Sequence, residues 1–260
     1  MKITIFGCGN IGKALAERLS PHHTLFLYDR NHDKAEQIER NGFGHAVKKP
    51  KEALQQSDIV ILAVKAQSFG DDTAVINGAD HAKQMLLSLL PGIPISRLKK
   101  QFPNNIIVRM MPNLALAYGE GLIGLCAEED VSKEERETCT SLCKPLGKTY
   151  WLPEAKIDAF TSLAGSGPAF AFAMIESMID AGITMGFNSK DSTELVVQML
   201  RGSLMMIEKS GKHPGELKWQ VASPAGTTIS GLNKFEEEAM RSGIIKTFIA
   251  AYERAKELSN

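Results

Sequence analysis

Apolar residues in the first part of the chain form short continuous runs, and each run is followed by a segment with helical spacing. The runs expected to be strands cover residues 2–6, 24–28, 58–63, 85–90 and 105–109. A strand that is apolar along its whole length is typical of a parallel sheet covered on both faces. The alternation of strands and helices therefore predicts an α/β fold with a doubly wound, mostly parallel sheet.

Two weaker apolar runs, at 121–126 and 148–152, extend this pattern. The connecting helices are expected at about 10–19, 31–41, 51–56, 93–101 and 132–143. After Pro153 the strand signal almost disappears, and long helical periods follow. These later helices are expected at about 168–185, 189–209, 214–221, 230–240 and 242–258. The change predicts two domains, an α/β domain over 1–152 and an all-helical domain over 153–260.

The helix expected at 168–185 is apolar on nearly all sides, and only Glu176 and Asp180 interrupt it. A helix of this kind has to be buried on most sides. A helical domain of this size has too little mass to bury it easily alone, so packing against a second copy is the natural solution. The pattern therefore predicts a homodimer that is held together by the helical domain.

The first strand leads without a gap into Gly7-Cys8-Gly9-Asn10-Ile11-Gly12, and a helix begins there. This glycine spacing between a strand and a helix is the fingerprint of a dinucleotide site. Gly7 would permit the turn, Gly9 the approach of a pyrophosphate, and Gly12 close packing of the helix on the strand. Asp29 ends the second strand about 20 residues later, where a carboxylate binds a ribose hydroxyl. We therefore expect a Rossmann domain that binds NAD or NADP.

The charge and cysteine content argue against several classes of partner. Thirty basic and thirty acidic side chains cancel, which gives no electrostatic reason to expect nucleic acid or an anionic membrane. No apolar run approaches the length of a membrane span. Four cysteines without metal-ligand spacing indicate buried, reduced thiols and no metal site. We expect a cytoplasmic protein that acts on a small molecule.

In an open α/β sheet the ligand lies beyond the carboxyl ends of the strands. The segments that leave those ends are 64–67, 91–94 and 110–113, and we expect them on the nicotinamide side of the cleft. Lys65 is either a catalytic ammonium or, as is more common at a loop edge, a solvated positioning group. Asn113 either bonds the carboxamide of the cofactor or is a turn residue after a proline.

Two glycine-rich segments, 165–168 and 223–228, lie at expected helix starts in the second half. The N–H groups and hydroxyls at such a start either bind a carboxylate or only cap the helix. The sequence contains no zinc-protease, nucleophile-elbow or P-loop motif, so little acid–base chemistry stands beside the nicotinamide. Reduction of a cyclic iminium needs little acid–base help from the protein, because the substrate already carries positive charge at the hydride acceptor.

Six segments together resemble the pyrroline-5-carboxylate reductase family over nearly the whole chain. They are 5–12, 57–67, 108–113, Glu154-x-x-x-Asp158, 163–169 and 221–228. The last three are specific, because generic Rossmann dehydrogenases lack them in this order. The resemblance implies reduction of Δ1-pyrroline-5-carboxylate to L-proline by hydride transfer from NAD(P)H, the last step of proline biosynthesis. It also implies a helical C-terminal domain that interlocks two subunits, with larger rings of dimers in some members.

The same motifs imply roles for individual residues. Thr228 matches the family threonine placed near the ring nitrogen of the substrate, and it is the expected catalytic residue. The expected substrate-binding residues are Ser166, Gly167, Ser223, Ala225, Gly226, Thr227 and Thr228. The expected cofactor-binding residues are Gly7, Gly9, Asn10, Ile11, Asp29, Arg30, Ala63, Val64, Lys65 and Asn113.

The choice between NADPH and NADH depends on two neighbouring residues. Asp29 favours NADH, because its charge would repel a 2′-phosphate, whereas Arg30 is suited to accept that phosphate. The frequent use of NADPH in the family favours NADPH slightly, on the condition that Asp29 can rotate away.

The chain departs from the family pattern at four places. Ala66 and Leu114-Ala115 replace proline and Thr-Pro, Leu89–Gly92 stands where Ala-Ala-Gly is common, and Ala225 replaces a glycine of the last loop. If position 225 requires a positive φ, the Cβ of alanine costs energy there. Two alternatives therefore stay open, a reductase for another cyclic imino acid and a non-catalytic NAD(P)-binding sensor. The intact Gly-Thr-Thr and Gly-Ser-Gly-Pro loops argue against the sensor.

Overall fold

The computed structural model of the chain describes residues 1–66, 69–70 and 84–259. It divides into two compact units. The first consists of Met1–Ser166 together with Ala251–Asn260, and the second of Gly167–Ala250. This division falls later in the chain than the domain boundary expected at residue 152, because residues 154–166 pack on the sheet of the first unit.

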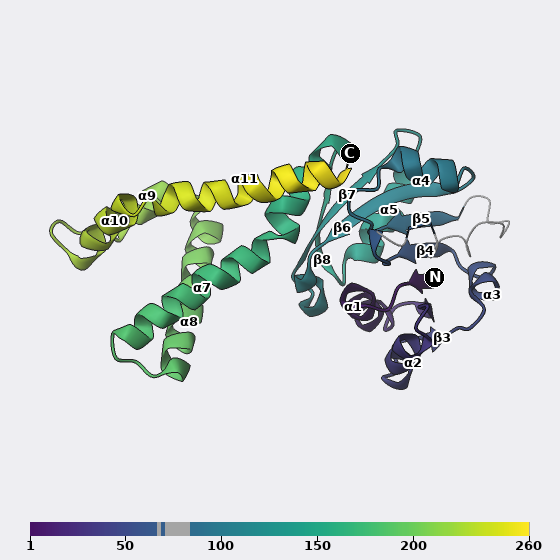
Figure 1. The fold of residues 1–260 in the computed structure, drawn as a ribbon, viewed down its shortest axis with the longest axis horizontal. Helices are drawn as coiled ribbons and strands as arrows, with labels where there is room; N and C mark the ends of the chain where they lie inside the picture. Colours follow the sequence, from purple (N-terminus) through teal and green to yellow (C-terminus); the bar gives the residue numbers. More distant parts are fainter. Residues whose placement is uncertain (67–68, 71–83, 260) are drawn as a thin grey trace. The chain divides into compact units, whose positions relative to one another are not determined.

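The first unit is built on an eight-stranded sheet in the order β3-β2-β1-β4-β5-β6-β7-β8 (Figure 1). Neighbouring strands are parallel, except that β6 and β7 are antiparallel. The strands are β1 (Lys2–Phe6), β2 (Thr24–Tyr28), β3 (His45–Ala46), β4 (Ile59–Leu62), β5 (Met85–Ser88), β6 (Ile106–Pro112), β7 (Gly121–Ala127) and β8 (Gly147–Trp151). The expected mostly parallel sheet is confirmed. Among the strands of the described residues, the sequence did not predict β3, because two residues are too short to show a strand pattern.

The helices of this unit alternate with the strands, as the sequence predicts. They are α1 (Asn10–Leu19), α2 (His32–Arg40), α3 (Pro50–Leu54), α4 (Ile95–Gln101), α5 (Lys133–Cys143) and α6 (Ile157–Phe160). Short 3-10 helices, η2 (Leu114–Tyr118) and η3 (Glu154–Lys156), and a π-helical turn, η4 (Thr161–Gly165), accompany them. The sequence did not predict α6, η2, η3 or η4, because one or two turns are too short for helical periodicity to appear.

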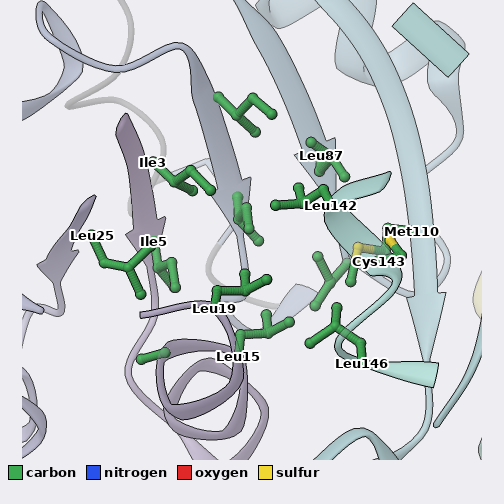
Figure 2. Close-up of a cluster of buried hydrophobic side chains, with 14 of the residues drawn as sticks. Ile3, Ile5, Leu15, Leu19, Leu25, Leu87, Met110, Leu142, Cys143 and Leu146 are labelled. Atoms are coloured by element: carbon green, nitrogen blue, oxygen red, sulfur yellow. The ribbon is translucent and has the colours of Figure 1, made fainter. Parts of the chain in front are cut away.

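Successive residues of a central strand enter opposite hydrophobic clusters, which explains the continuous apolar runs. Ile59 and Ile61 of β4 lie in one cluster, whereas Val60 and Leu62 lie in the other. Residues of α1, α2 and α5 complete the first cluster, and residues of α3, α4 and α6 complete the second. Figure 2 shows part of the first cluster, with Ile3 and Ile5 of β1, Leu15 and Leu19 of α1, and Leu87 of β5 beside Leu142 of α5. Helices therefore cover both faces of the sheet.

Residues 154–166 belong to the first unit because they pack on its sheet. Ile157 of α6 is fully buried in the second cluster. Glu154 accepts hydrogen bonds from the guanidinium of Arg109 on β6 and from the backbone N–H of Ile95 at the start of α4. These long-range contacts leave no periodic trace in the local sequence. The division by contacts therefore comes after Ser166, although the strand signal ends near residue 152.

The second unit contains helices only. They are α7 (Gly167–Thr184), α8 (Ser189–Ser210), α9 (Pro214–Gln220), α10 (Thr227–Glu237) and α11 (Met240–Ser259), the end of which belongs to the first unit. The helices expected from the sequence are all present. Gly186 and Gly211, which follow the last turns of α7 and α8, have positive φ. α10 begins at Thr227, earlier than the expected residue 230, so both threonines of the Gly-Thr-Thr loop lie in its first turn.

The helices of the second unit expose much apolar surface. Within α7, the described side chains include only Gly182 as a buried residue, and Phe172, Met185 and Leu204 are each more than half exposed.

None of the helices in the described part of the chain combines the length and the apolar character needed to cross a bilayer.

Candidate active site

The glycine-rich turn between β1 and α1 has the geometry of an anion cradle. Gly7 has φ 100, and a Cβ there would lie 2.5 Å from the carbonyl oxygen of Ala63. At Gly12 a Cβ would collide with the carbonyl oxygen of Gly7, so the helix packs closely on the turn. At Gly9 an added Cβ would meet nothing within 4 Å. Open space therefore lies in front of Gly9, at the positive end of α1, where a pyrophosphate fits.

A cavity of about 220 Å³ adjoins this turn. It lies at the carboxyl ends of β1, β2 and β4, where the order of the sheet reverses and where open α/β sheets bind their ligands. Seven of its lining residues are ones that we expected to bind the cofactor. These residues are Gly7, Gly9, Asp29, Arg30, Ala63, Val64 and Lys65. Phe6, Tyr28 and Lys34 line it too; the sequence analysis missed them, although Tyr28 directly precedes Asp29.

Asp29 holds the glycine-rich turn through its side chain. One carboxylate oxygen accepts a hydrogen bond of 2.8 Å from the backbone N–H of Cys8, and the other accepts one of 2.9 Å from the N–H of Asn31. Rotation of Asp29 out of the cavity would break both bonds. The sequence favoured NADPH on the condition that Asp29 can turn away. In this structure, turning away would cost the free energy of two hydrogen bonds.

Cys8, inside the same turn, is a buried neutral thiol. Burial, and to a lesser extent the nearby charge of Asp29, raises its pKa to about 12. Its side chain is only 6% exposed. Because the thiolate is the reactive form, Cys8 is inert as a nucleophile near neutral pH.

A second cavity of about 640 Å³ lies on the other side of the Ala63–Lys65 segment. Residues from all three segments predicted for the nicotinamide side line it, together with the expected cofactor residue Ile11. They are Val64, Lys65, Ala66, Pro91, Ile93, Met111 and Pro112. Gln67, at the end of the first of these segments, lies outside the described residues. The structure thus brings together segments that are far apart in the sequence.

Gly165, from the glycine-rich segment 165–168 that the sequence indicated, also lines this second cavity. Three further lining residues had no sequence signal: Thr161 of the π-helical turn, Arg97 of α4 and Leu258 of α11. A Cβ at Gly92 would collide with the carbonyl oxygen of Leu258, so the end of α11 packs directly on the loop after β5. No local pattern points to Leu258, because it reaches the cavity from the opposite end of the chain.

The Ala63–Lys65 segment lines both cavities. A dinucleotide with its pyrophosphate at Gly9 can therefore extend from the smaller cavity across this segment into the larger one. The titratable side chains in the lining of the larger cavity are those of Lys65 and Arg97. The arrangement suits a hydride transfer that depends on orientation and exclusion of water rather than on a strong acid.

Two residues of the expected cofactor set do not line either cavity. Asn10 is exposed in the first turn of α1, beside Gly9. Asn113 is 7% exposed, and its amide is engaged by the backbone at Leu122 and Ala164. The cofactor contacts of both residues stay predictions.

The expected substrate loop of the second unit has a strained backbone. Ala225 has φ 58, so the backbone at this position has the left-handed conformation in which the Cβ of alanine costs energy. Gly226 is the N-cap of α10, and Thr227 and Thr228 follow in its first turn. Because no side chain in the described structure caps this helix start, its first N–H groups can face a ligand. The geometry is suitable for binding a carboxylate.

The described residues contain no cluster of three or more histidine, cysteine or acidic side chains that could hold a metal ion. All four cysteines are free and buried.

Comparison with known proteins connects both halves of the chain to oxidoreductases. Residues 2–92 match the family model described as NADP oxidoreductase coenzyme F420-dependent, and residues 154–258 match that of pyrroline-5-carboxylate reductase dimerisation. The pyrroline-5-carboxylate reductase of Methanosarcina acetivorans is 35% identical over 79% of this chain and 76% of its own. That of Aquifex aeolicus is 31% identical over 99% of this chain and 97% of its own.

The chain belongs to the pyrroline-5-carboxylate reductase family. A crystal structure of the Plasmodium falciparum pyrroline carboxylate reductase with NADP bound has a TM-score of 0.91, with 27% identity over 100% of this chain and 98% of that one. The Coxiella burnetii pyrroline-5-carboxylate reductase has a TM-score of 0.88, also with 27% identity. The resemblance read from the sequence motifs is thus confirmed at the level of the family. The match to a dimerisation model indicates that the helical unit takes part in an oligomer.

Proposed function

We propose that this protein reduces Δ1-pyrroline-5-carboxylate to L-proline with NAD(P)H. The observation that carries the proposal is the pair of cavities joined by Ala63–Lys65 in a member of this reductase family. The cradle at Gly9 suits the pyrophosphate, and the larger cavity is wide enough for a nicotinamide beside a small ring. When bound, the cofactor would supply a hydride to the carbon of the protonated C=N bond, and the electron pair of that bond would move to the ring nitrogen, which leaves the amine of proline.

The chain's own residues bind and orient the two reactants. We propose that Gly7, Gly9, Asn10 and Ile11 receive the pyrophosphate and that Ala63, Val64 and Lys65 run along the cofactor. Asp29 and Arg30 would face the adenosine ribose. Ser166 and Gly167 would contact the substrate. Ser223, Ala225, Gly226 and Thr227 would hold its carboxylate, because N–H groups at a helix start stabilise a negative charge.

Thr228 is the proposed catalytic residue. It lies in the first turn of α10 and is partly exposed. A hydroxyl near the ring nitrogen can donate a hydrogen bond to the imine or assist its protonation. An iminium is a better hydride acceptor than a neutral imine, so this bond would accelerate the transfer.

The structure adds Lys34 to the residues that bear on cofactor preference. Arg30 and Lys34 both line the smaller cavity, and two cations there suit the 2′-phosphate of NADPH. Asp29 opposes them through its charge, and its two backbone hydrogen bonds hold it in place. We propose that the enzyme accepts both cofactors and that the balance of these three charges sets the ratio.

We also propose that the protein acts as a homodimer in the cytoplasm and that its dimers can assemble into a larger ring. The apolar surface on α7 and α8 supports a dimer, because exposed patches of this kind mark protein interfaces. Four free, buried thiols support a reducing compartment.

Turnover of Δ1-pyrroline-5-carboxylate by the pure protein tests the function directly. NADPH and NADH consumption at neutral pH is followed at 340 nm, and proline is identified as the product. Thr228→Ala should lower kcat by about 10- to 100-fold, while the Kd for NADPH changes less than about twofold. Thr193→Ala is the matched control, because it removes an exposed hydroxyl on α8 that donates to the backbone carbonyl of Ser189.

Tight NADPH binding without turnover of this substrate would contradict the proposed reaction. It would instead favour another cyclic imino acid or a non-catalytic sensor, which a panel of cyclic imines distinguishes. Full activity of Thr228→Ala would remove Thr228 from the mechanism.

A further inference from the structure

We infer that Asn113 is a positioning residue, whose side-chain amide fixes the π-helical turn Thr161–Gly165 beside the reaction cavity. The role in catalysis rests on the proposed function, whereas the bridge itself does not. The amide Nδ2 donates a hydrogen bond of 3.0 Å to the carbonyl of Ala164, and Oδ1 accepts one of 3.1 Å from the N–H of Leu122. One side chain thereby joins the end of β6, the start of β7 and the π-helical turn.

The amide of Asn113 takes the place of its own backbone carbonyl in the sheet. Its backbone N–H donates to the carbonyl of Leu122, as in an antiparallel pair. The return bond from the N–H of Leu122 goes to the side-chain oxygen, because the backbone carbonyl of Asn113 accepts from Leu116 at the start of η2. The side chain thus continues the ladder by one position while the backbone turns away.

The carbonyl of Ala164 requires such a donor because of the sequence that follows it. In an α-helix this carbonyl would accept the N–H of the residue four positions later. That residue is Pro168, which has no N–H. Ala164 is 5% exposed, so an unpaired carbonyl there would be costly. Asn113 supplies the missing donor from a position far away in the sequence.

The partners leave only one orientation for the amide. A carbonyl can only accept and a backbone N–H can only donate, so Nδ2 must face Ala164 and Oδ1 must face Leu122. Aspartate would retain the acceptor and lose the donor, and an apolar residue would lose both. Among the common side chains of this size, asparagine alone satisfies both neighbours.

The bridged turn bears directly on the cavity. Thr161 and Gly165 lie in its wall, and the proposed substrate residues Ser166 and Gly167 follow immediately. The turn is closed by a bond from the N–H of Ser166 to the carbonyl of Thr161, five residues earlier. π-helical turns are rare, and they are frequent at functional sites. Asn113 supports this turn from β6, which also carries Met111 and Pro112 of the cavity wall.

Hydrogen exchange tests the bridge without reference to any substrate. Asn113→Ala should increase amide exchange over residues 161–166 by about tenfold, because a buried hydrogen bond is lost. Asn113→Asp replaces the donor with a carboxylate oxygen that repels the carbonyl of Ala164, and it should raise exchange over the same residues at least as much. Asn105→Ala is the matched control, since it loses a side-chain bond to the backbone of Gln84 just before β6 begins.

Rescue by a backbone donor is the decisive comparison. Pro168→Ala restores an N–H at the position that an α-helix would use for Ala164. The effect of Asn113→Ala on exchange and on kcat/KM should then be about threefold or less in the Pro168→Ala background, against about tenfold in the natural background. Equal effects in the two backgrounds would overturn the inference.

Steady-state kinetics separate positioning from direct cofactor binding. In Asn113→Ala we expect the KM for Δ1-pyrroline-5-carboxylate to rise about tenfold, with a Kd for NADPH within about twofold of the natural protein. A raised Kd for NADPH with an unchanged substrate KM would show that Asn113 binds the cofactor and would overturn the positioning role. If the natural protein does not turn over this substrate, the proposed function fails, and the exchange experiment still decides the bridge.

Discussion

At the scale of single residues, two alanines carry backbone strain that glycine would relieve. Ala225 and Ala239 have φ 58 and φ 52, and a Cβ in the left-handed region costs about 1–2 kcal/mol. Ala225 lies just before α10 and Ala239 just before α11. The strain at Ala225 sits in the loop that we propose for the substrate carboxylate, which is where natural proteins retain strain.

Ala225→Gly should therefore stabilise the protein and also alter substrate binding. We expect the free energy of unfolding to rise by about 0.5–1 kcal/mol, since the relief of strain exceeds the added entropy of the unfolded chain. Urea denaturation measures this change. Ala239→Gly is the matched control: it should give a similar gain in stability, with no change in the KM for Δ1-pyrroline-5-carboxylate. A stabilised Ala239→Gly beside an unchanged Ala225→Gly would show that position 225 does not hold a positive φ in solution.

At the scale of the elements, an ion pair between the buried Arg109 and the partly exposed Glu154 joins β6, α4 and η3. Arg109 of β6 has a side chain that is 5% exposed, and its Nη1 lies 2.9 Å from Oε1 of Glu154. The same oxygen accepts the N–H of Ile95 at the start of α4, where a negative charge also stabilises the helix dipole. Nε and Nη2 of Arg109 are buried without a hydrogen-bond partner in the described structure. Glu154 is therefore the group that balances this buried charge.

Glu154→Ala should destabilise the protein by about 3 kcal/mol, because it leaves the Arg109 guanidinium buried without a counter-charge. Glu154→Gln should cost less, since its amide oxygen still accepts both hydrogen bonds. Urea denaturation at neutral pH measures both. As a control, Glu137→Ala removes an exposed ion pair with Lys133 and should change the free energy of unfolding by less than about 0.5 kcal/mol. Equal stability of Glu154→Ala and Glu137→Ala would show that the Arg109–Glu154 ion pair contributes little to the free energy of unfolding.

At the scale of the whole molecule, four buried thiols make stability sensitive to alkaline pH. Burial raises the pKa of Cys8, Cys139 and Cys143 to about 12 and that of Cys126 to about 11, from an ordinary value of 9.0. In the unfolded chain the thiols ionise above pH 9, whereas in the folded chain they remain protonated. The folded state then binds more protons, so stability is fully present below pH 9 and falls as pH rises towards 11 or 12.

The free energy of unfolding should accordingly decrease between pH 9.5 and 10.5. Each thiol contributes a slope of about 1.4 kcal/mol per pH unit. Cys126→Ala should lower stability at pH 8, because it leaves a cavity, but should flatten the alkaline slope by about that amount. Urea midpoints measured at pH 8, 9.5 and 10.5 for both proteins provide the comparison. Parallel pH profiles would show that Cys126 ionises equally in the two states.

The sequence by itself determined the longer helices and strands and the glycine-rich turn beside the smaller cavity. Continuous apolar runs identified β1, β2, β4, β5 and β6, because strands of a covered parallel sheet bury both faces. Gly7, Gly9 and Gly12 indicated the cradle, because backbone turns and close approaches are decided within a few residues. Glycines at positions 186 and 211 marked helix ends for the same reason. The motifs, read together, indicated the family.

Only the tertiary structure decided how residues distant in the sequence act together. The sequence placed Asn113 at the cofactor or in a turn, and only the structure shows that its amide bonds Leu122 and Ala164. The π-helical turn, α6 and the wall contributed by Leu258 had no local signal, because their geometry depends on partners in other elements. The sequence raised the question whether Ala225 has a positive φ, and only the structure shows that it does. Local propensity acts over a few residues, whereas pairing and packing are settled by the whole fold.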